Sequence, residues 1–115
     1  MPSSDCVFCK IVAGEIPCRK IFENESLIAF DDITPMAPVH FLVVSKEHIA
    51  TLDDAEPRHT ELLGRMLATL ARLAREKGVA TEGYRQVINC GKAAGQVVPH
   101  LHMHALGGRP MRLMG

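Results

Sequence analysis

Histidine and apolar residues alternate strictly over residues 100–106, which read HLHMHAL. Side chains alternate between the two faces of a β-strand, so the pattern predicts a strand that carries His100, His102 and His104 on one face, each about 7 Å from the next. The apolar residues between them would pack on the opposite face. The fold must therefore contain a sheet with one apolar side and one side that carries three imidazoles.

A fourth histidine is predicted to lie beside these three. Residues 39–45 (VHFLVVS) are apolar except for His40, which is typical of a central strand covered on both faces, so His40 should be buried or half-buried. If this strand lies next to the histidine strand, repulsion between charged rings should lower their pKa values below about 6.5. Neutral rings offer lone pairs, so the cluster suits either phosphate chemistry or a metal ion.

The rest of the chain predicts an α+β domain with a five-stranded antiparallel sheet, one long helix and one short helix. No linker or internal repeat interrupts the 115 residues, so residues 1–115 should form one domain. Leucine and methionine recur at helical spacing over residues 57–77, and this stripe should face the core or a second subunit. The other expected elements are a short helix over residues 7–13, a hairpin over residues 20–22 and 26–30, and a strand over residues 84–90.

The overall composition argues against nucleic-acid and membrane partners. Lysine plus arginine and aspartate plus glutamate are balanced at 13 each, which provides no basic surface for nucleic acid. No apolar run approaches the roughly 18 residues of a membrane span. The first five residues, MPSSD, lack the basic and apolar regions of a secretory signal, so we expect a cytoplasmic protein.

Two further patterns point to a site. Cys6 and Cys9 are spaced Cys-x-x-Cys, and without a secretory signal this spacing indicates a metal or thiol pair rather than a disulfide. Gly91 and Gly95 precede the histidine strand, and residues without a Cβ let backbone N–H groups approach a phosphate closely. The other two cysteines have no partner at metal-ligand spacing.

Residues 100–106 resemble the signature of the histidine triad (HIT) superfamily, His-φ-His-φ-His-φ-φ with φ apolar, at all seven positions. The resemblance covers almost the whole chain, including CVFCKI at residues 6–11 and FDDITPMAPVH at residues 30–40. It is closest to the short Hint-like branch, the purine nucleoside phosphoramidases. The resemblance implies a HIT-like fold that pairs into a homodimer, a purine nucleotide as ligand, and no organic cofactor.

In that branch the middle histidine attacks the α-phosphorus of a nucleoside 5′-phosphoramidate, an AMP- or GMP-linked amine, and water resolves the nucleotidyl-histidine. By position this nucleophile is His102. His104 and His100 would contact the phosphate and support the nucleophile, with His40 behind them. Asp32 matches the carboxylate that binds the two ribose hydroxyls, although a turn after a strand also favours aspartate.

The resemblance further implies which residues bind the nucleotide. An apolar wall would face the nucleoside, and a loop would stabilise phosphate charge as an oxyanion hole does. The wall consists of Val7, Phe8, Ile11, Ile16, Phe30 and Ile33, and the loop of Asn89, Gly95, Gln96, Val97 and Val98.

Two positions depart from the family pattern. Val97 stands where relatives often carry a hydroxyl or carboxyl residue that helps the leaving amine, and valine can neither donate nor accept a proton. Protonation of the amine would then come from His104 or water. Residues 109–115 lack the aromatic with which close relatives reach the partner subunit's site, so the selectivity set by that tail does not carry over.

Some bacterial relatives with the same Cys-x-x-Cys opening bind zinc, and the matching residues here are Cys6, Cys9, His48 and His100. Two thiolates and two imidazoles suit a closed, tetrahedral, structural Zn²⁺ site, with one ion per chain. The alternatives are a redox role for the cysteine pair and an ordinary turn position for His48.

Three other functions are compatible with the sequence. A dinucleoside polyphosphate hydrolase of the same superfamily would attack the same phosphorus with a different leaving group. A regulatory module would hold AMP in the triad with incidental turnover, which Val97 favours. A structural metal protein would use the four cysteines and six histidines, but it would leave His102 and His104 without a role.

Overall fold

The computed structural model describes residues 5–114 of the chain. Residues 1–4 and 115 lie outside the described residues, and with them most of the segment on which the expectation about a secretory signal rests. Among residues 5–114, no helix is both long enough and apolar enough to cross a membrane.

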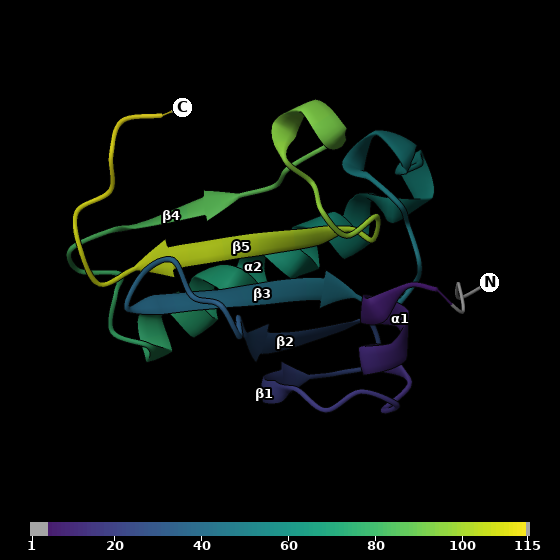
Figure 1. The fold of residues 1–115 in the computed structure, drawn as a ribbon, viewed down its shortest axis with the longest axis horizontal. Coiled ribbons are helices and arrows are strands. Elements are labelled where there is room, and N and C mark those ends of the chain that lie inside the picture. Colours follow the sequence, from purple (N-terminus) through teal and green to yellow (C-terminus); the bar gives the residue numbers. More distant parts are fainter. Residues whose placement is uncertain (1–4, 115) are drawn as a thin grey trace.

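An antiparallel sheet with the strand order β1-β2-β3-β5-β4 forms the centre of the described fold (Figure 1). Together with two α-helices within residues 5–114, this sheet confirms the predicted α+β architecture. The strands are β1 (Arg19–Glu23), β2 (Leu27–Asp31), β3 (Val39–Ser45), β4 (Tyr84–Val87) and β5 (His102–Gly107), the helices are α1 (Val7–Val12) and α2 (Thr60–Glu76), and 3₁₀ helices span Leu52–Asp54, Pro57–His59 and Lys92–Ala94.

Different helices cover the two faces of the sheet (Figure 1). On one face, α2 buries Met66 and Leu70 in a core that also contains Met103 of β5. On the other face, Phe8 of α1 packs in a second cluster with Leu42 of β3. Burial on both faces confirms the prediction for β3, and the apolar stripe of α2 faces the core.

Two predicted boundaries shift by a few residues. The sequence predicts the long helix from residue 57, but Pro57–His59 form a 3₁₀ turn and α2 begins at Thr60. The predicted strand over residues 84–90 ends at Val87, where it pairs with His104 of β5.

The most consequential difference concerns His100. The sequence predicts this residue on the same strand face as His102 and His104, but β5 begins only at His102. The backbone before it follows a different path, because the His100 N–H donates to the Val98 carbonyl (2.8 Å) and the Leu101 N–H donates to the Ile49 carbonyl (2.6 Å). The His100 side chain consequently has partners of its own.

Candidate active site and metal centre

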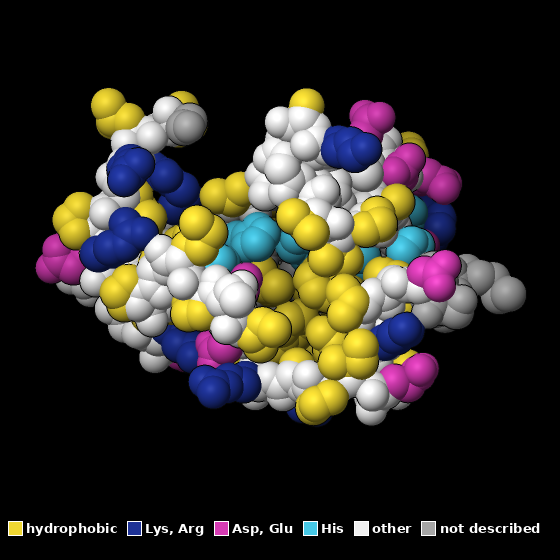
Figure 2. Space-filling view, in the orientation of Figure 1, with side chains coloured by type: hydrophobic (Ala, Val, Ile, Leu, Met, Phe, Trp, Pro, Cys, Tyr) yellow, Lys and Arg dark blue, Asp and Glu magenta, His cyan; other side chains and the backbone are white. Residues whose placement is uncertain are grey.

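Three of the predicted histidines lie close together on the face of the sheet that carries α1. In the register of β3 and β5, His102 is opposite Val44 and His104 is opposite Leu42. His40 precedes Leu42 by two residues, so it lies diagonally opposite His104 on the same face. Figure 2 shows histidine side chains in a hollow on this side of the molecule, next to a hydrophobic patch and near a group of Lys and Arg side chains.

A chain of hydrogen bonds fixes the tautomers of His40 and His104. The backbone N–H of Met36 donates to Nδ1 of His40 (3.1 Å), so this nitrogen carries the lone pair of the ring. The proton of neutral His40 is then on Nε2, which lies 3.0 Å from Nδ1 of His104 and 3.5 Å from the carboxylate of Asp32. His104 accepts at Nδ1 and keeps its own proton on Nε2. His104 can therefore donate a hydrogen bond to an anion.

His102 has the opposite tautomer. Its Nδ1 lies 2.6 Å from the backbone carbonyl of His100, and because a carbonyl can only accept, Nδ1 carries the proton. Nε2 of the neutral ring then carries the lone pair. Phe8 packs edge-on against this ring with centroids 4.9 Å apart, and the His104 ring lies 5.0 Å away. The site thus combines one nucleophilic nitrogen with one hydrogen-bond donor.

Burial keeps these rings neutral. His40 and His102 are only 6% and 7% exposed, and removal from water lowers the pKa of each below its ordinary value. Burial, together with repulsion from His102 and His40, lowers the pKa of His104 to about 4. The negative charge of Asp32 raises the pKa of all three rings, but by less than burial lowers it. The predicted direction of the pKa shift is thus correct, but its main cause is burial rather than the predicted repulsion between charged rings, which contributes at His104 and not at His40 or His102.

We expect the lowered pKa of His104 to reduce the stability of the fold in mild acid. Histidine in the unfolded chain has a pKa of about 6.5, so between that value and about 4 the unfolded state binds a proton that folded His104 excludes. Stability is therefore highest above this window and falls as the pH is lowered through it. In urea unfolding, lowering the pH from about 7.5 to about 5.5 should reduce the free energy of unfolding of the wild type by about 1 kcal/mol more than that of a His104→Asn variant. Equal losses in the two proteins would contradict this expectation.

Cys6, Cys9, His48 and His100 form a second cluster, as the family resemblance implies. Their ligand atoms all lie within 4.8 Å of one another. The Nδ1 atoms of His48 and His100 are 3.2 Å apart, and Sγ of Cys9 lies 3.1 Å and 3.5 Å from them. The bond lengths of tetrahedral Zn²⁺ require about 3.3 Å between two nitrogens and about 3.6 Å between sulfur and nitrogen. The donor set and its spacing therefore fit a four-coordinate Zn²⁺ ion.

His100 is oriented for metal binding. Its Nε2 donates to the Ser45 carbonyl (2.6 Å), so Nδ1 carries the lone pair and faces Sγ of Cys6 at 3.3 Å. Burial lowers its pKa, which favours the neutral form that binds metal. The carbonyl of the same residue accepts the Nδ1 proton of His102. His100 thus belongs to the candidate metal centre through its side chain and contacts His102 through its backbone.

Most of the predicted nucleoside wall gathers around α1. Phe8 and Phe30 are buried with ring centroids 5.8 Å apart, and Ile11 packs against the same cluster. Ile16 lines a cavity of about 230 Å³ together with Ile11. The two members of the wall that are exposed are Val7 and Ile33.

Gln96 holds the predicted phosphate loop together. Its Oε1 accepts from the Gly91 N–H (2.8 Å), and its Nε2 donates to the carbonyls of Ala50 (2.8 Å) and Val98 (3.0 Å). Gly95 has a φ of +90°, which side chains with a Cβ rarely adopt. Both polar atoms of the Gln96 side chain are bonded to backbone groups of this loop and of Ala50, so any phosphate contact by this residue falls to its backbone.

The other three loop residues differ in burial, and Val98 is half-buried against the cluster that contains Phe8. Asn89 is half-buried and lies two residues beyond the end of β4. Val97 is 88% exposed and lines a cavity of about 310 Å³ with Val7, Val98 and His48. Val97 therefore offers an apolar surface, and no proton, to whatever enters this cavity.

Backbone groups make the contacts in these sites that could not be predicted from the sequence. The carbonyls of Ser45 and His100 and the N–H of Met36 determine the tautomers of three histidines. Every residue carries these backbone groups, so no residue type marks their positions in the sequence.

Known proteins resemble this chain in sequence and in fold. A family model described as "Scavenger mRNA decapping enzyme C-term binding" matches residues 5–114. The chain is 39% identical to the purine nucleoside phosphoramidase of Escherichia coli over 109 residues, which are 95% of this chain and 92% of that protein. A HIT family hydrolase from Legionella pneumophila is 45% identical with a TM-score of 0.93, covering 95% of this chain and 97% of that one. A zinc-bound histidine triad protein from Mycobacterium smegmatis is 35% identical with a TM-score of 0.79, covering 96% and 80%.

Proposed function

The chain belongs to the histidine triad superfamily, and on this basis we propose that it hydrolyses purine nucleoside 5′-phosphoramidates through a covalent nucleotide on His102. One observation carries the proposal: the Nδ1 proton of His102 is held by the His100 carbonyl at 2.6 Å, so the lone pair is on Nε2. The activity named for the E. coli relative supports the phosphoramidate as the substrate class.

In the first displacement, the Nε2 lone pair of His102 attacks the α-phosphorus. An N–P bond forms as the P–N bond to the leaving amine breaks. The His102 ring becomes cationic, and the His100 carbonyl at Nδ1 stabilises that charge. The phosphate oxygens accept hydrogen bonds from Nε2–H of His104 and from the backbone of the phosphate loop. The amine departs with the bonding electron pair and takes a proton from water, because Val97 has none to give.

In the second displacement, water resolves the nucleotidyl-histidine. The water oxygen bonds to phosphorus, the bond between phosphorus and Nε2 breaks, and the His102 ring recovers its lone pair. The proton that this water loses balances the proton that the amine took up. The products are the nucleoside monophosphate and the free amine.

The nucleoside would lie against the apolar wall formed by α1 and β2, with its ribose hydroxyls on Asp32. The Oδ1 atom of Asp32 accepts from the N–H and the hydroxyl of Thr34, at 2.8 Å and 3.1 Å. Oδ2 is the atom near His40. The carboxylate is thereby fixed in a position from which it can accept hydrogen bonds from two hydroxyls.

Zinc, when bound by Cys6, Cys9, His48 and His100, supplies a structural link between α1 and the segment before β5. We also propose a cytoplasmic homodimer, as in the family branch that the sequence resembles.

A nucleotide-binding regulatory module is the second candidate, and the exposed Val97 favours it. Without a side chain that protonates the amine, the first displacement slows while AMP binding is retained. The dinucleoside polyphosphate hydrolase is the remaining alternative.

The test measures the hydrolysis of two substrates and the binding of AMP by the purified protein under the same conditions. The protein should hydrolyse an adenosine 5′-phosphoramidate with a kcat/KM at least about tenfold above that for diadenosine tetraphosphate. Preference for the tetraphosphate would establish the polyphosphate hydrolase instead. Calorimetric AMP binding without turnover of either compound would establish the regulatory module.

We expect Val97→Ser to accelerate the release of poorly leaving alkylamines. A hydroxyl at this position can pass a proton to the amine, which should raise kcat by about three- to tenfold. An arylamine of low basicity leaves without such help, so its kcat should not change. Val97→Ala is the matched control, because it removes the same apolar bulk without adding a hydroxyl. Equal rates for the serine and alanine variants with an alkylamine substrate would contradict the expectation.

A further inference from the structure

Arg109 connects the C-terminal segment to the loop between β2 and β3. Its guanidinium donates through Nη2 to the carbonyl of Met36 (2.6 Å) and through Nη1 to the carbonyl of Pro110 (3.1 Å). The N–H of Met36 donates to Nδ1 of His40, as described above. The backbone of Met36 is thus bonded on one side to Arg109 and on the other side to His40.

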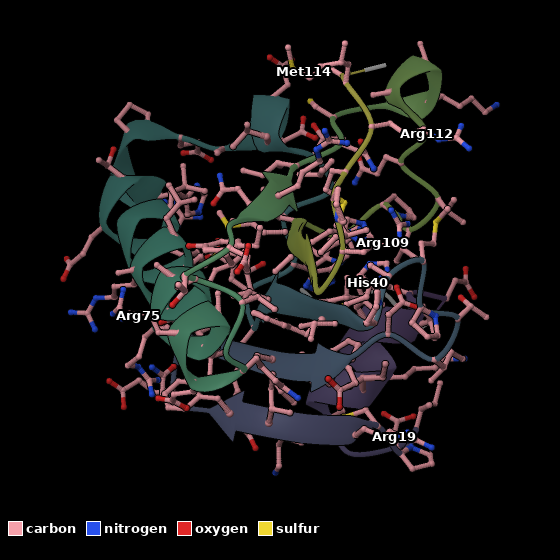
Figure 3. The ribbon with its side chains drawn as sticks, turned by 90° about the vertical axis from the view of Figure 1, so that its left-hand side faces the viewer. Arg19, His40, Arg75, Arg109, Arg112 and Met114 are labelled. Atoms are coloured by element: carbon pink, nitrogen blue, oxygen red, sulfur yellow. The ribbon has the colours of Figure 1, made fainter. Side chains whose placement is uncertain are left out.

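We propose that Arg109 is a positioning residue for the hydrolysis, which acts through Met36 and His40 on His104. The inference rests on the proposed function for its consequence in catalysis, and on hydrogen-bond geometry for the contacts themselves. Figure 3 shows Arg109 next to His40, with Arg112 further along the same segment.

The loop between β2 and β3 needs such support, because the core holds it at few points. Residues 33–36 are exposed, and Ala37 is the buried residue of this stretch. The C-terminal segment holds the loop at a second point as well. Gly108 packs so closely on Pro38 that a Cβ atom at this position would lie 2.9 Å from the Pro38 Cβ. Residues 108 and 109 together therefore fix the end of the loop that leads into His40.

The consequence for the site follows from the direction of each hydrogen bond. When the Met36 N–H donates to Nδ1 of His40, the His40 proton must lie on Nε2, 3.0 Å from Nδ1 of His104. His104 then presents its N–H on Nε2 toward the phosphate. If Met36 moves away, the Nε2–H tautomer of His40 keeps only the weaker support of the Asp32 carboxylate, 3.5 Å from Nε2, so the tautomers of His40 and His104 are no longer fixed. Arg109 thus maintains the donor that stabilises charge on the phosphate.

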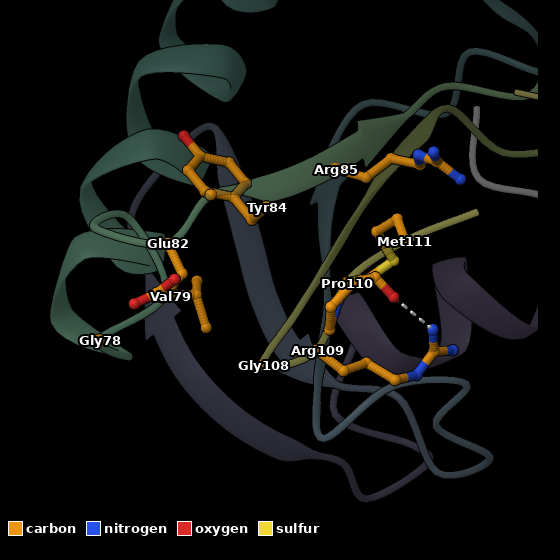
Figure 4. Close-up of a pocket in the computed structure, with 10 residues that line it drawn as sticks. Gly78, Val79, Glu82, Tyr84, Arg85, Gly108, Arg109, Pro110 and Met111 are labelled. Atoms are coloured by element: carbon orange, nitrogen blue, oxygen red, sulfur yellow. Dashed lines mark hydrogen bonds between the residues drawn. The ribbon is translucent and has the colours of Figure 1, made fainter. Parts of the chain in front are cut away.

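Arg109 also borders a groove of about 640 Å³ that contains Glu82, Tyr84 and Arg85. Figure 4 shows its side chain extending away from Val79 and Glu82 on the opposite side of this groove, with the bond to Pro110 marked. The guanidinium is therefore directed toward the loop rather than toward a ligand in the groove.

The test uses Arg109→Gln, the conservative variant Arg109→Lys, and Arg112→Gln as a matched control that removes the same charge from the same segment. Loss of one hydrogen bond from a charged donor should lower kcat for an adenosine 5′-phosphoramidate by about three- to tenfold, with KM changed by less than about twofold. Arg109→Lys should recover part of the loss, and Arg112→Gln should match the wild type.

A second readout does not depend on turnover. Nitrogen-15 NMR of the histidine rings in the ligand-free protein should show His40 and His104 as Nε2–H tautomers in the wild type and in Arg112→Gln. In Arg109→Gln, both rings should shift toward a mixture of tautomers. Wild-type ring spectra in Arg109→Gln, or an equal loss of kcat in Arg112→Gln, would overturn the proposal. If the wild type hydrolyses no phosphoramidate, the proposed function fails, and the ring spectra still decide whether Arg109 positions His40.

Discussion

Replacement of His102 by asparagine is expected to lower kcat for adenosine 5′-phosphoramidate hydrolysis by at least about 10³-fold. The asparagine amide can still donate to the His100 carbonyl, so the local packing against Phe8 should survive while the nucleophilic lone pair is lost. His104 cannot substitute for it, because its Nδ1 accepts from His40 at 3.0 Å and its Nε2 carries the proton. Initial rates measured by amine release at saturating substrate provide the comparison.

Binding of AMP serves as the control for this variant. The apolar wall and Asp32 are unchanged in His102→Asn, so calorimetry should give an AMP affinity within about threefold of the wild type. A variant that binds AMP normally and keeps more than about a tenth of the wild-type kcat would show that another group performs the attack.

Loss of the metal should have the second large effect, and it should act on stability. Cys9→Ser removes one of the four ligands that join α1 to His48 and to the segment before β5. An ion present at about 1,000 times its Kd stabilises the folded state by about 4 kcal/mol, so the variant should unfold at a Tm roughly 15 °C lower. Calorimetry with the zinc content determined by mass spectrometry measures both quantities.

Cys90→Ser is the matched control, because Cys90 is exposed and lies outside the metal cluster. It should keep one zinc ion per chain and the wild-type Tm. The Cys9→Ser variant should also bind AMP more weakly, since α1 carries Phe8 and Ile11 of the nucleoside wall. If Cys9→Ser retained a full equivalent of zinc and the wild-type Tm, the assignment of this cluster as a structural metal site would be wrong.

The sequence predicts the sheet and the two histidines of β5 because both depend on short-range patterns. Alternation of apolar and polar residues places His102 and His104 on one face, and the pattern survives folding because the opposite face is buried under α2. His40 is predicted for a similar reason, since an apolar strand buried on both faces leaves no exposed position for it. The apolar run around it is therefore sufficient to predict its burial.

His100 shows where this reasoning fails. The alternation includes it, but the backbone turns at Val98 and bonds to Ile49, a segment distant in sequence. Only the family resemblance pairs His100 with His48 and the two cysteines. The contact between Arg109 and Met36 has no sequence signal at all, because an exposed side chain meets a backbone carbonyl 73 residues away. The homodimer stays a prediction, as do the roles assigned to the nucleotide-binding residues.

The central claim is that the reaction passes through a nucleotide bonded to Nε2 of His102. The most direct measurement mixes the protein with an adenosine 5′-phosphoramidate, stops the reaction in alkaline denaturant before one turnover is complete, and determines the intact mass. The account predicts a gain of one adenylyl group that peptide mapping places on His102 and that is absent in His102→Asn. Full wild-type turnover with no adduct on the protein, or an adduct on a different residue, would contradict it.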